Sequence, residues 1–191
     1  MKSKEFFDQN DVTIFTSTPV VSIDRNKKIL SLPNQESLPY NKLVIATGSR
    51  VRKLDVEGSS LKNISYLRSI EDANKLKEYF KFGKKLVIVG AGYVGLEVAA
   101  TAIKKGINVT LIEMENRVMS RTVDPVISKY FDSLHRRNGV EIVLGAALEK
   151  FEGKDVVERV ICSNGQVIEA DGVLIGVGIL PNQELAESAG L

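Results

Sequence analysis

Hydrophobic and polar residues fall into blocks along the middle of the chain that predict strands alternating with helices. The continuous apolar run at residues 86–89 is typical of a strand buried on both faces of a parallel sheet. Residues 93–105 carry apolar side chains at helical spacing, and residues 108–113 return to a strand pattern. A strand, a helix and a second strand in this order predict a βαβ unit.

The pattern that follows repeats this alternation and then breaks it. Asp and Pro at residues 124–125 are typical of a helix start, and a third strand is expected at residues 140–144. Three short strands come next, and Asn164 and Gly165 predict a tight hairpin between the last two. Residues 173–178 predict another apolar strand. This order predicts an α/β fold, a Rossmann-like parallel sheet with a three-stranded antiparallel insertion.

The N-terminal part of the chain has a different pattern, with short runs of β-branched side chains. It predicts strands at residues 12–15, 20–23, 29–32 and 42–46. Residues 50–66 look irregular, and Ser69 with Asp72 forms a capping-box pattern that predicts a helix start. We therefore expect a β-rich segment that precedes the parallel sheet.

Charge and composition narrow the class of protein. The 191 residues include 26 Lys and Arg against 24 Asp and Glu, well mixed along the chain, with a net charge of +2. This balance gives no electrostatic case for binding nucleic acid or a membrane surface. No apolar run approaches the ~20 residues that a membrane helix needs. The first residues lack the apolar centre of a secretory signal. We therefore expect a protein of the cytoplasm.

The chain offers few groups for covalent or metal chemistry. Its single cysteine, Cys162, excludes an internal disulfide and a cysteine-ligated metal site, and we interpret it as a small buried apolar side chain. Its single histidine, His135, has no nucleophile near it in the sequence, and we interpret it as a surface or packing residue. The sequence predicts no catalytic side chain and no metal ligand.

Gly90, Gly92 and Gly95 form the pattern G-x-G-x-x-G between the predicted strand and the predicted helix. This context makes the otherwise weak pattern informative. We assign the first glycine to a tight turn, the second to close approach of a pyrophosphate, and the third to helix packing. Free N–H groups and the helix dipole would hold the phosphates. The residues predict a dinucleotide-binding loop, with a purely structural turn as the alternative.

Glu113 ends the second predicted strand, 23 positions after Gly90. An acidic residue about 20 positions after the first glycine accepts hydrogen bonds from the ribose hydroxyls in such folds. Its charge would repel the 2′-phosphate of NADPH, so it favours NADH. Arg117 and Arg121 follow closely and could instead approach a phosphate. An exposed strand-end carboxylate is the simpler reading of Glu113. For Glu97, in the first turn of the helix, the alternative is simple dipole stabilisation.

Three motifs, in this order, resemble those of one superfamily. Residues 40–48 resemble the second flavin-binding motif of the FAD-dependent pyridine nucleotide-disulfide oxidoreductases. Residues 86–113 resemble their NAD(P)H-binding motif, and residues 175–182 resemble the strand that returns to the flavin domain. The closest resemblance within the superfamily is to ferredoxin and rubredoxin reductases. Residues 66–73, 95–100 and 182–191 carry it.

The resemblance implies that NADH reduces FAD, which passes electrons singly to a ferredoxin- or rubredoxin-type acceptor. By position, Glu97 would contact the nicotinamide end, Tyr93 would stack or gate there, and Arg121 would lie near the adenosine. The flavin would meet Ala46, Thr47 and Gly48. The dinucleotide would be bound by Gly90, Gly92, Tyr93, Val94, Gly95, Glu97, Glu113, Arg121, Gly176, Val177 and Gly178.

The chain also departs from the family pattern. It carries one glycine motif where the family has a further, N-terminal one for the flavin, and it ends before the family's Gly-Asp motif and interface domain. The resemblance divides it into a partial FAD-domain segment at residues 1–66, an NAD(P)H-binding domain at 67–178, and the start of the return to the FAD domain at 179–191. We expect a truncated piece of a flavoprotein that is inactive alone.

Two other functions remain open at this point. One is an NADH oxidase or a disulfide reductase of the same superfamily, whose reactive cysteines would lie outside this chain. The other is a regulatory module similar to apoptosis-inducing factor, in which nucleotide binding controls interactions. The electron acceptor and the oligomeric state are likewise left open.

Overall fold

The computed structural model describes residues 3–79 and 81–191, which form two compact units. One unit comprises the chain up to Ser49 together with Pro181–Leu191, and the other comprises Arg50–Leu180. The second unit contains the glycine motif and is described first.

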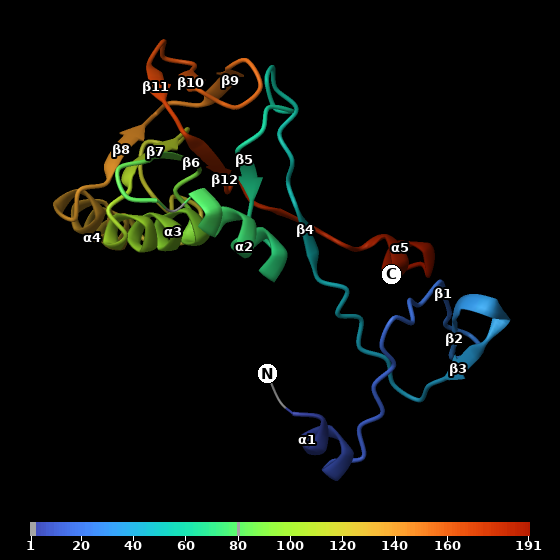
Figure 1. The fold of residues 1–191 in the computed structure, drawn as a ribbon. Helices are drawn as coiled ribbons and strands as arrows, with labels where there is room; N and C mark the ends of the chain where they lie inside the picture. The colour runs from blue at the N-terminus through green and yellow to red at the C-terminus, as the bar shows by residue number, and fades with distance from the viewer. Residues whose placement is uncertain (1–2, 80) are drawn as a thin grey trace. The chain divides into compact units, whose positions relative to one another are not determined.

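A five-stranded parallel sheet forms the centre of the second unit (Figure 1). Its strand order is β5, β12, β6, β7, β8. The bounds are β5 (Ile64–Tyr66), β12 (Gly172–Ile175), β6 (Lys85–Val89), β7 (Asn108–Glu113) and β8 (Glu141–Leu144). Every pairing between these neighbours is parallel. The predicted βαβ unit is therefore confirmed, with β6 in the middle of the sheet.

Three helices cover one face of this sheet (Figure 1). They are α2 (Ile70–Tyr79), α3 (Tyr93–Lys104) and α4 (Pro125–Arg137). Because successive side chains of a strand point to opposite faces, Leu86 and Ile88 of β6 pack with Ala99 of α3 in one buried cluster. The capping box predicted before α2 is present, since the Asp72 N–H donates to Ser69 Oγ and Asp72 Oδ2 accepts from the Ser69 N–H.

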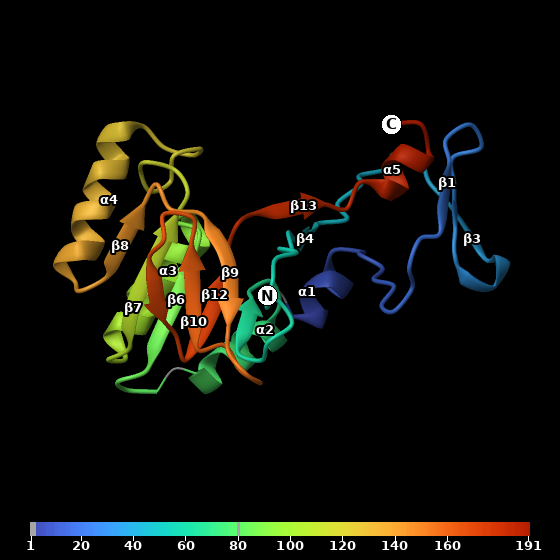
Figure 2. The ribbon, with the colours of Figure 1, turned by 90° about the horizontal axis from the view of Figure 1, so that it is seen from above.

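The opposite face is covered by a three-stranded antiparallel sheet (Figures 1 and 2). It consists of β9 (Leu148–Glu152), β10 (Arg159–Cys162) and β11 (Val167–Glu169), with β10 in the middle. Val87 and Val89 point to this side, where they cluster with Phe151 and Cys162. The predicted insertion is confirmed. Cys162 is fully buried, as expected, and its burial raises the pKa of the thiol.

The spacing of Ile127, Tyr130, Phe131 and Leu134 predicts an apolar face for α4, and the side that packs inward matches it only in part. Ile127 and Tyr130 are 45% and 57% exposed, whereas Ser128 and His135 are buried. Ser128 Oγ donates to the Val118 carbonyl at 2.6 Å, which satisfies a polar group inside the core. Burial lowers the pKa of His135, although Asp132 opposes this shift. His135 is thus a packing residue. Of the expected apolar face, Phe131 packs against the core, whereas Ile127 and Tyr130 are exposed.

The first unit is built on a small antiparallel sheet of β1 (Ser22–Asp24), β2 (Ile29–Ser31) and β3 (Ser37–Pro39). It also contains α1 (Lys4–Gln9), a 3₁₀ turn η1 (Pro33–Gln35) and α5 (Glu184–Ser188). The Arg25 guanidinium donates to the Gly190 carbonyl at 2.9 Å and ties the C-terminal residues to the β1–β2 turn. A separate two-stranded sheet pairs β4 (Ser49–Val51) with β13 (Ile179–Pro181). Among the described residues, no helix has the length and apolar character to cross a membrane.

Several strand predictions outside the parallel sheet were wrong. Residues 12–15 and 42–46 form no strand, and Val44 is 87% exposed. An apolar strand needs neighbours on its edges and faces, and the described chain supplies none to these segments. The predicted strand at 173–178 ends at Ile175, because glycines follow and Gly178 has a φ of +111°. Conversely, β3, β4 and β5 lie in segments that were expected to be loops.

Candidate functional site

A cleft of about 640 Å³ lies at the carboxyl ends of β6, β7, β8 and β12. Open α/β sheets bind their ligands at this edge. All of the lining residues belong to the second unit. They are Arg52, Leu54, Val89, Gly90, Ala91, Gly92, Ile112, Glu113, Met114, Met119, Ser120, Arg121, Thr122, Ala146, Ala147, Leu148, Gly176, Val177 and Gly178.

The three fingerprint glycines have different surroundings. Gly90 has a φ of +103°, and a Cβ on it would lie 2.6 Å from the Gly176 carbonyl oxygen. A Cβ on Gly95 would lie 2.1 Å from the Gly90 carbonyl oxygen, so only glycine lets α3 pack so close to the loop. A Cβ on Gly92 would meet nothing within 4 Å. The first and third glycines are required by the fold, whereas the second keeps the loop backbone open to the cleft.

No side chain of α3 itself compensates the amino end of this helix. Gly92 is the N-cap and supplies no side-chain hydrogen bond, and the first turn contains no acidic residue. Glu97, expected in the first turn, lies beyond it because the helix begins at Tyr93. Unpaired N–H groups and the positive end of a helix dipole favour an anion such as a phosphate.

Glu113, at the end of β7, connects the strand to the glycine loop. Its Oε2 accepts from the Ala91 N–H at 2.7 Å, and its Oε1 accepts from the Glu115 N–H at 3.0 Å. The Met119 N–H in turn donates to the Ala91 carbonyl at 2.9 Å. The segment after β7 is therefore folded back on the glycine loop, with the Glu113 carboxylate in the wall of the cleft.

The two arginines that follow Glu113 have different environments. The Arg117 guanidinium donates to the Ser120 carbonyl at 2.6 Å and to the Val123 carbonyl at 2.9 Å, and so braces the loop. Arg121 lines the cleft with its side chain 73% exposed, and its Nη2 lies 3.5 Å from Glu115 Oε1. Of these two arginines, Arg121 is the one placed to meet a ligand.

The cleft brings together part of the predicted cofactor-binding set, namely Gly90, Gly92, Glu113, Arg121, Gly176, Val177 and Gly178. Gly95 lies buried behind the loop, and Tyr93, Val94 and Glu97 are exposed on α3 outside this lining.

The predicted flavin residues, Ala46, Thr47 and Gly48, belong to the first unit and are exposed. There the Thr47 hydroxyl donates to the Asn182 carbonyl at 2.5 Å, and the Asn182 side-chain amide donates to the Thr47 carbonyl at 3.0 Å. The segment is therefore held to the residues that follow β13.

Sequence reasoning found seven of the nineteen lining residues and missed the other twelve. Ala146, Ala147 and Leu148 follow β8, and the rule that carboxyl ends of parallel strands share an edge would have found them. Met114 and Met119 lie in the loop after β7 and carried no chemical signal. Arg52 lies in a segment expected to be irregular, and its place in the lining depends on tertiary contacts.

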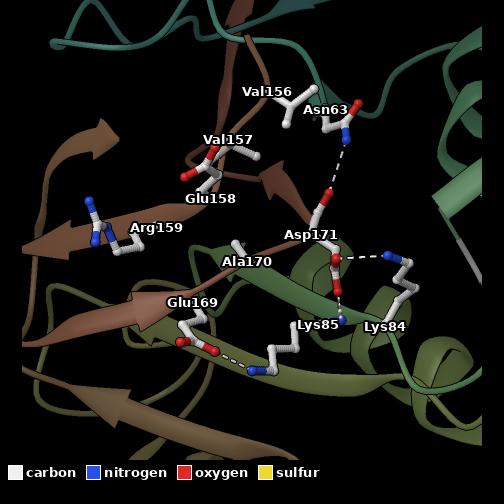
Figure 3. Close-up of a pocket in the computed structure, with 10 residues that line it drawn as sticks. All are labelled: Asn63, Lys84, Lys85, Val156, Val157, Glu158, Arg159, Glu169, Ala170 and Asp171. Atoms are coloured by element: carbon white, nitrogen blue, oxygen red, sulfur yellow. Dashed lines mark hydrogen bonds and ion pairs between the residues drawn. The ribbon is translucent and has the colours of Figure 1, made fainter. Parts of the chain in front are cut away.

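A second hollow, of about 560 Å³, lies at the opposite, amino end of β6 and β12 (Figure 3). Its charged side chains pair with one another. Lys84 Nζ lies 2.8 Å from Asp171 Oδ1, Asp171 Oδ2 accepts from the Lys85 N–H at 2.8 Å, and Lys85 Nζ pairs with Glu169. The hydrogen bond from Lys84 lowers the pKa of Asp171, and the hydrogen bond from Lys85 lowers that of Glu169. These pairs join β6, β11 and β12, and we interpret them as structural ties.

Comparison with known proteins agrees with this geometry. Residues 3–191 match the family described as pyridine nucleotide-disulphide oxidoreductase, so the chain belongs to this family. It is similar to the rhodocoxin reductase of Rhodococcus erythropolis, with 38% identity over 192 residues that cover 100% of this chain and 45% of that protein. The rubredoxin-NAD(+) reductase of Ectopseudomonas oleovorans is also 38% identical, over a match that covers 100% of this chain and 50% of that protein.

Solved structures give the same result. The ferredoxin reductase for the CYP199A2 system from Rhodopseudomonas palustris superposes with a TM-score of 0.91 at 38% identity, covering 100% of this chain and 47% of that protein. The expected family and the expected α/β fold are both confirmed. The chain spans about half the length of the relatives it matches.

Proposed function

We propose that the second unit binds a pyridine dinucleotide in the cleft, with NADH preferred over NADPH. The observation that carries this proposal is the open glycine loop at the amino end of α3, faced by the Glu113 carboxylate. The domain assigned to this task, residues 67–178, lies within the second unit. The protein would be the NADH-binding portion of a flavin-dependent reductase.

Each part of the cleft suits one part of the ligand. The N–H groups in the first turn of α3 would hold the pyrophosphate, because the N-cap Gly92 has no side chain that could accept from them and the space beside it is open. Glu113 would accept hydrogen bonds from the adenosine ribose hydroxyls, and its charge would repel a 2′-phosphate. Arg121 would lie at the same, adenosine end. Gly176, Val177 and Gly178 would line the dinucleotide at the end of β12.

The nicotinamide would supply a hydride to the flavin when both are bound. We assign Glu97 and Tyr93 to the nicotinamide end, and Val94 beside them, because these side chains lie at the start of α3 and are exposed. Ala46, Thr47 and Gly48 would meet FAD in the longer protein. The backbone of this segment is held by Asn182, which supports a fixed position for it.

The acceptor is proposed from the relatives. Their names specify rhodocoxin, rubredoxin and ferredoxin systems, so a small ferredoxin- or rubredoxin-type protein is the acceptor that we propose. This proposal for the electron acceptor does not rest on any residue of the cleft, since we assign the cleft to the dinucleotide.

Direct titration tests the proposal. The chain contains no tryptophan, so the emission of bound NADH can be followed without tryptophan background. We expect saturable NADH binding by emission and by calorimetry, with weaker NADPH binding. Failure of both dinucleotides to bind would overturn the proposed function.

Glu113→Ala tests the selectivity. It removes the ribose acceptor, so we expect NADH to bind about tenfold more weakly, as for a lost hydrogen bond to a charged group. NADPH should weaken less, because a repulsive charge is lost as well. Since Glu113 also holds the loop, Glu113→Gln serves as a control of similar size, and melting curves should accompany both variants. An unchanged NADH-to-NADPH ratio would show that Glu113 does not set the preference.

A further inference from the structure

We infer that Glu115 is a selectivity residue that acts through Arg121, masking a binding position for the 2′-phosphate of NADPH. This inference rests on the proposed function, since it concerns the adenosine end of the same cleft. It assigns to the chain a latent capacity for NADPH that Glu115 suppresses in addition to the repulsion proposed for Glu113.

The first step is that the cleft contains a cation suited to phosphate. Arg121 lines the cleft beside Ser120, and its side chain is largely exposed. A guanidinium is planar and can donate two parallel hydrogen bonds to a phosphate. Arg117 cannot play this part in the described fold, because its guanidinium donates to two carbonyls of its own loop.

The second step is that this cation already has an anionic partner. Arg121 Nη2 lies 3.5 Å from Glu115 Oε1, and both side chains are accessible to solvent. Exposed ion pairs at this distance are weak, so this one does not hold the loop in place. A 2′-phosphate would have to displace the Glu115 carboxylate or bind beside it, and either event is electrostatically unfavourable.

The third step is that the Glu115 side chain can be changed without moving its backbone. The Glu115 N–H donates to Glu113 Oε1 at 3.0 Å, and the Glu115 carbonyl accepts from the Gly145 N–H at 2.9 Å. Neither bond involves the Glu115 carboxylate. Glu113 and Glu115 therefore have separable tasks: the first accepts from the ribose and repels a 2′-phosphate directly, and the second pairs with the Arg121 guanidinium.

The experiment is Glu115→Gln in the full chain, titrated with NADPH, NADH and adenosine 2′-monophosphate. Loss of one nearby charge should tighten NADPH and adenosine 2′-monophosphate about three- to tenfold, with NADH changed by less than about twofold. The gain should shrink at high salt. Glu115→Asp, which keeps the carboxylate, should restore discrimination against NADPH.

Two further variants separate this role from a general effect. Glu158→Gln makes the same chemical change beside the second hollow, at the other end of the sheet, and should leave both affinities unchanged (Figure 3). In an Arg121→Gln background, Glu115→Gln should give no gain, because the group that receives the phosphate is missing.

The outcomes distinguish this inference from the proposed function. If the unaltered chain binds NADH but Glu115→Gln leaves the NADPH-to-NADH ratio within about twofold, the inference is wrong and the proposed function stands. A gain that persists without Arg121 also overturns it. If the unaltered chain binds neither dinucleotide, both fail together.

Discussion

Gly92, the N-cap of α3, and Gly95, in the first turn of that helix, lie three residues apart, yet a methyl group would meet different surroundings at each. At Gly95 it would lie 2.1 Å from a backbone oxygen, and at Gly92 it would meet nothing within 4 Å. The packing of α3 therefore requires glycine at position 95. The lack of a side chain at Gly92 keeps the backbone accessible from the cleft. The spacing of the motif predicted the packing role of Gly95, and the open space at Gly92 is consistent with the pyrophosphate contact, which stays a prediction.

Alanine at each position should separate stability from binding. Gly95→Ala must push α3 away from the loop, so we expect it to lower the free energy of unfolding by about 2–4 kcal/mol. Gly92→Ala has an ordinary φ of −81° and should leave stability nearly unchanged. It should weaken NADH about tenfold or more, because its methyl group faces the pyrophosphate. Thermal melts and NADH titrations measure the two effects. Full NADH affinity in Gly92→Ala would exclude this loop as the phosphate site.

Other residue roles could not be read from spacing. Glu113 was placed correctly in the cleft wall because a strand end fixes its position. Arg117 and Arg121 looked equivalent in the sequence, and only the fold of the loop shows that Arg117 donates to two carbonyls within it. A side chain that hydrogen-bonds to its own loop follows no helical or strand periodicity, so the sequence could not predict this contact.

At the scale of elements, α4 shows both the strength and the limit of a hydrophobic pattern. Its start was predicted from Asp124, whose Oδ1 accepts from the Val126 N–H at 2.9 Å. Its buried face was predicted only in part: Phe131 packs on the core as expected, but Ser128 also packs inward, where it donates to a carbonyl on the loop after β7. A hydrophobic pattern shows which side chains are polar. It cannot show that a polar side chain will be buried because a distant segment supplies its hydrogen-bond partner.

Ser128→Ala tests the contact between α4 and this loop. Removal of the hydroxyl leaves the buried Val118 carbonyl without this donor, so the free energy of unfolding should fall by about 1–2 kcal/mol. Limited proteolysis should then cut more readily in the loop that precedes α4, since that loop loses its anchor. Ser133→Ala, on the same helix but only partly buried, is the matched control. Equal stability of the two variants would show that the contact contributes nothing.

At the scale of the whole second unit, the sequence predicted four of the five strands of the parallel sheet and missed one edge strand. Apolar or largely apolar runs mark β6, β7, β8 and β12. The edge strand β5 has only half-buried residues and lies in a segment that looked irregular. In the first unit, the segment at residues 42–46 has strand propensity but no pairing partner, and tertiary context overrides propensity.

The paired charges at the amino end of the sheet predict a response to acid. The pKa values of Glu169 and Asp171 lie below their ordinary values of 4.5 and 3.8 in the folded chain. A lowered pKa stabilises the fold above the ordinary value, and this contribution is lost as the pH falls through the folded value. Stability should therefore decline as the pH is lowered from about 5 towards 3.

Asp171→Asn isolates the contribution of that carboxylate. Its uncharged side chain cannot gain a proton, so the variant should lose less stability than the unaltered chain over the same pH range. Urea unfolding at each pH measures the difference. Parallel pH profiles for the two proteins would show that the Lys84–Asp171 pair does not contribute.

The pairing of β4 with β13 has a consequence for protein engineering. The Arg52 N–H donates to the Gly178 carbonyl at 3.1 Å, so the points where the chain enters and leaves the second unit are neighbours. A segment with adjacent ends can be excised by two cuts and closed with a short linker, or grafted into a surface loop of a host protein, without stretching its backbone. Residues 52–178 thus have adjacent ends suited to a portable cassette, and its insertion into a host protein would test whether this segment folds and carries the proposed binding without the first unit.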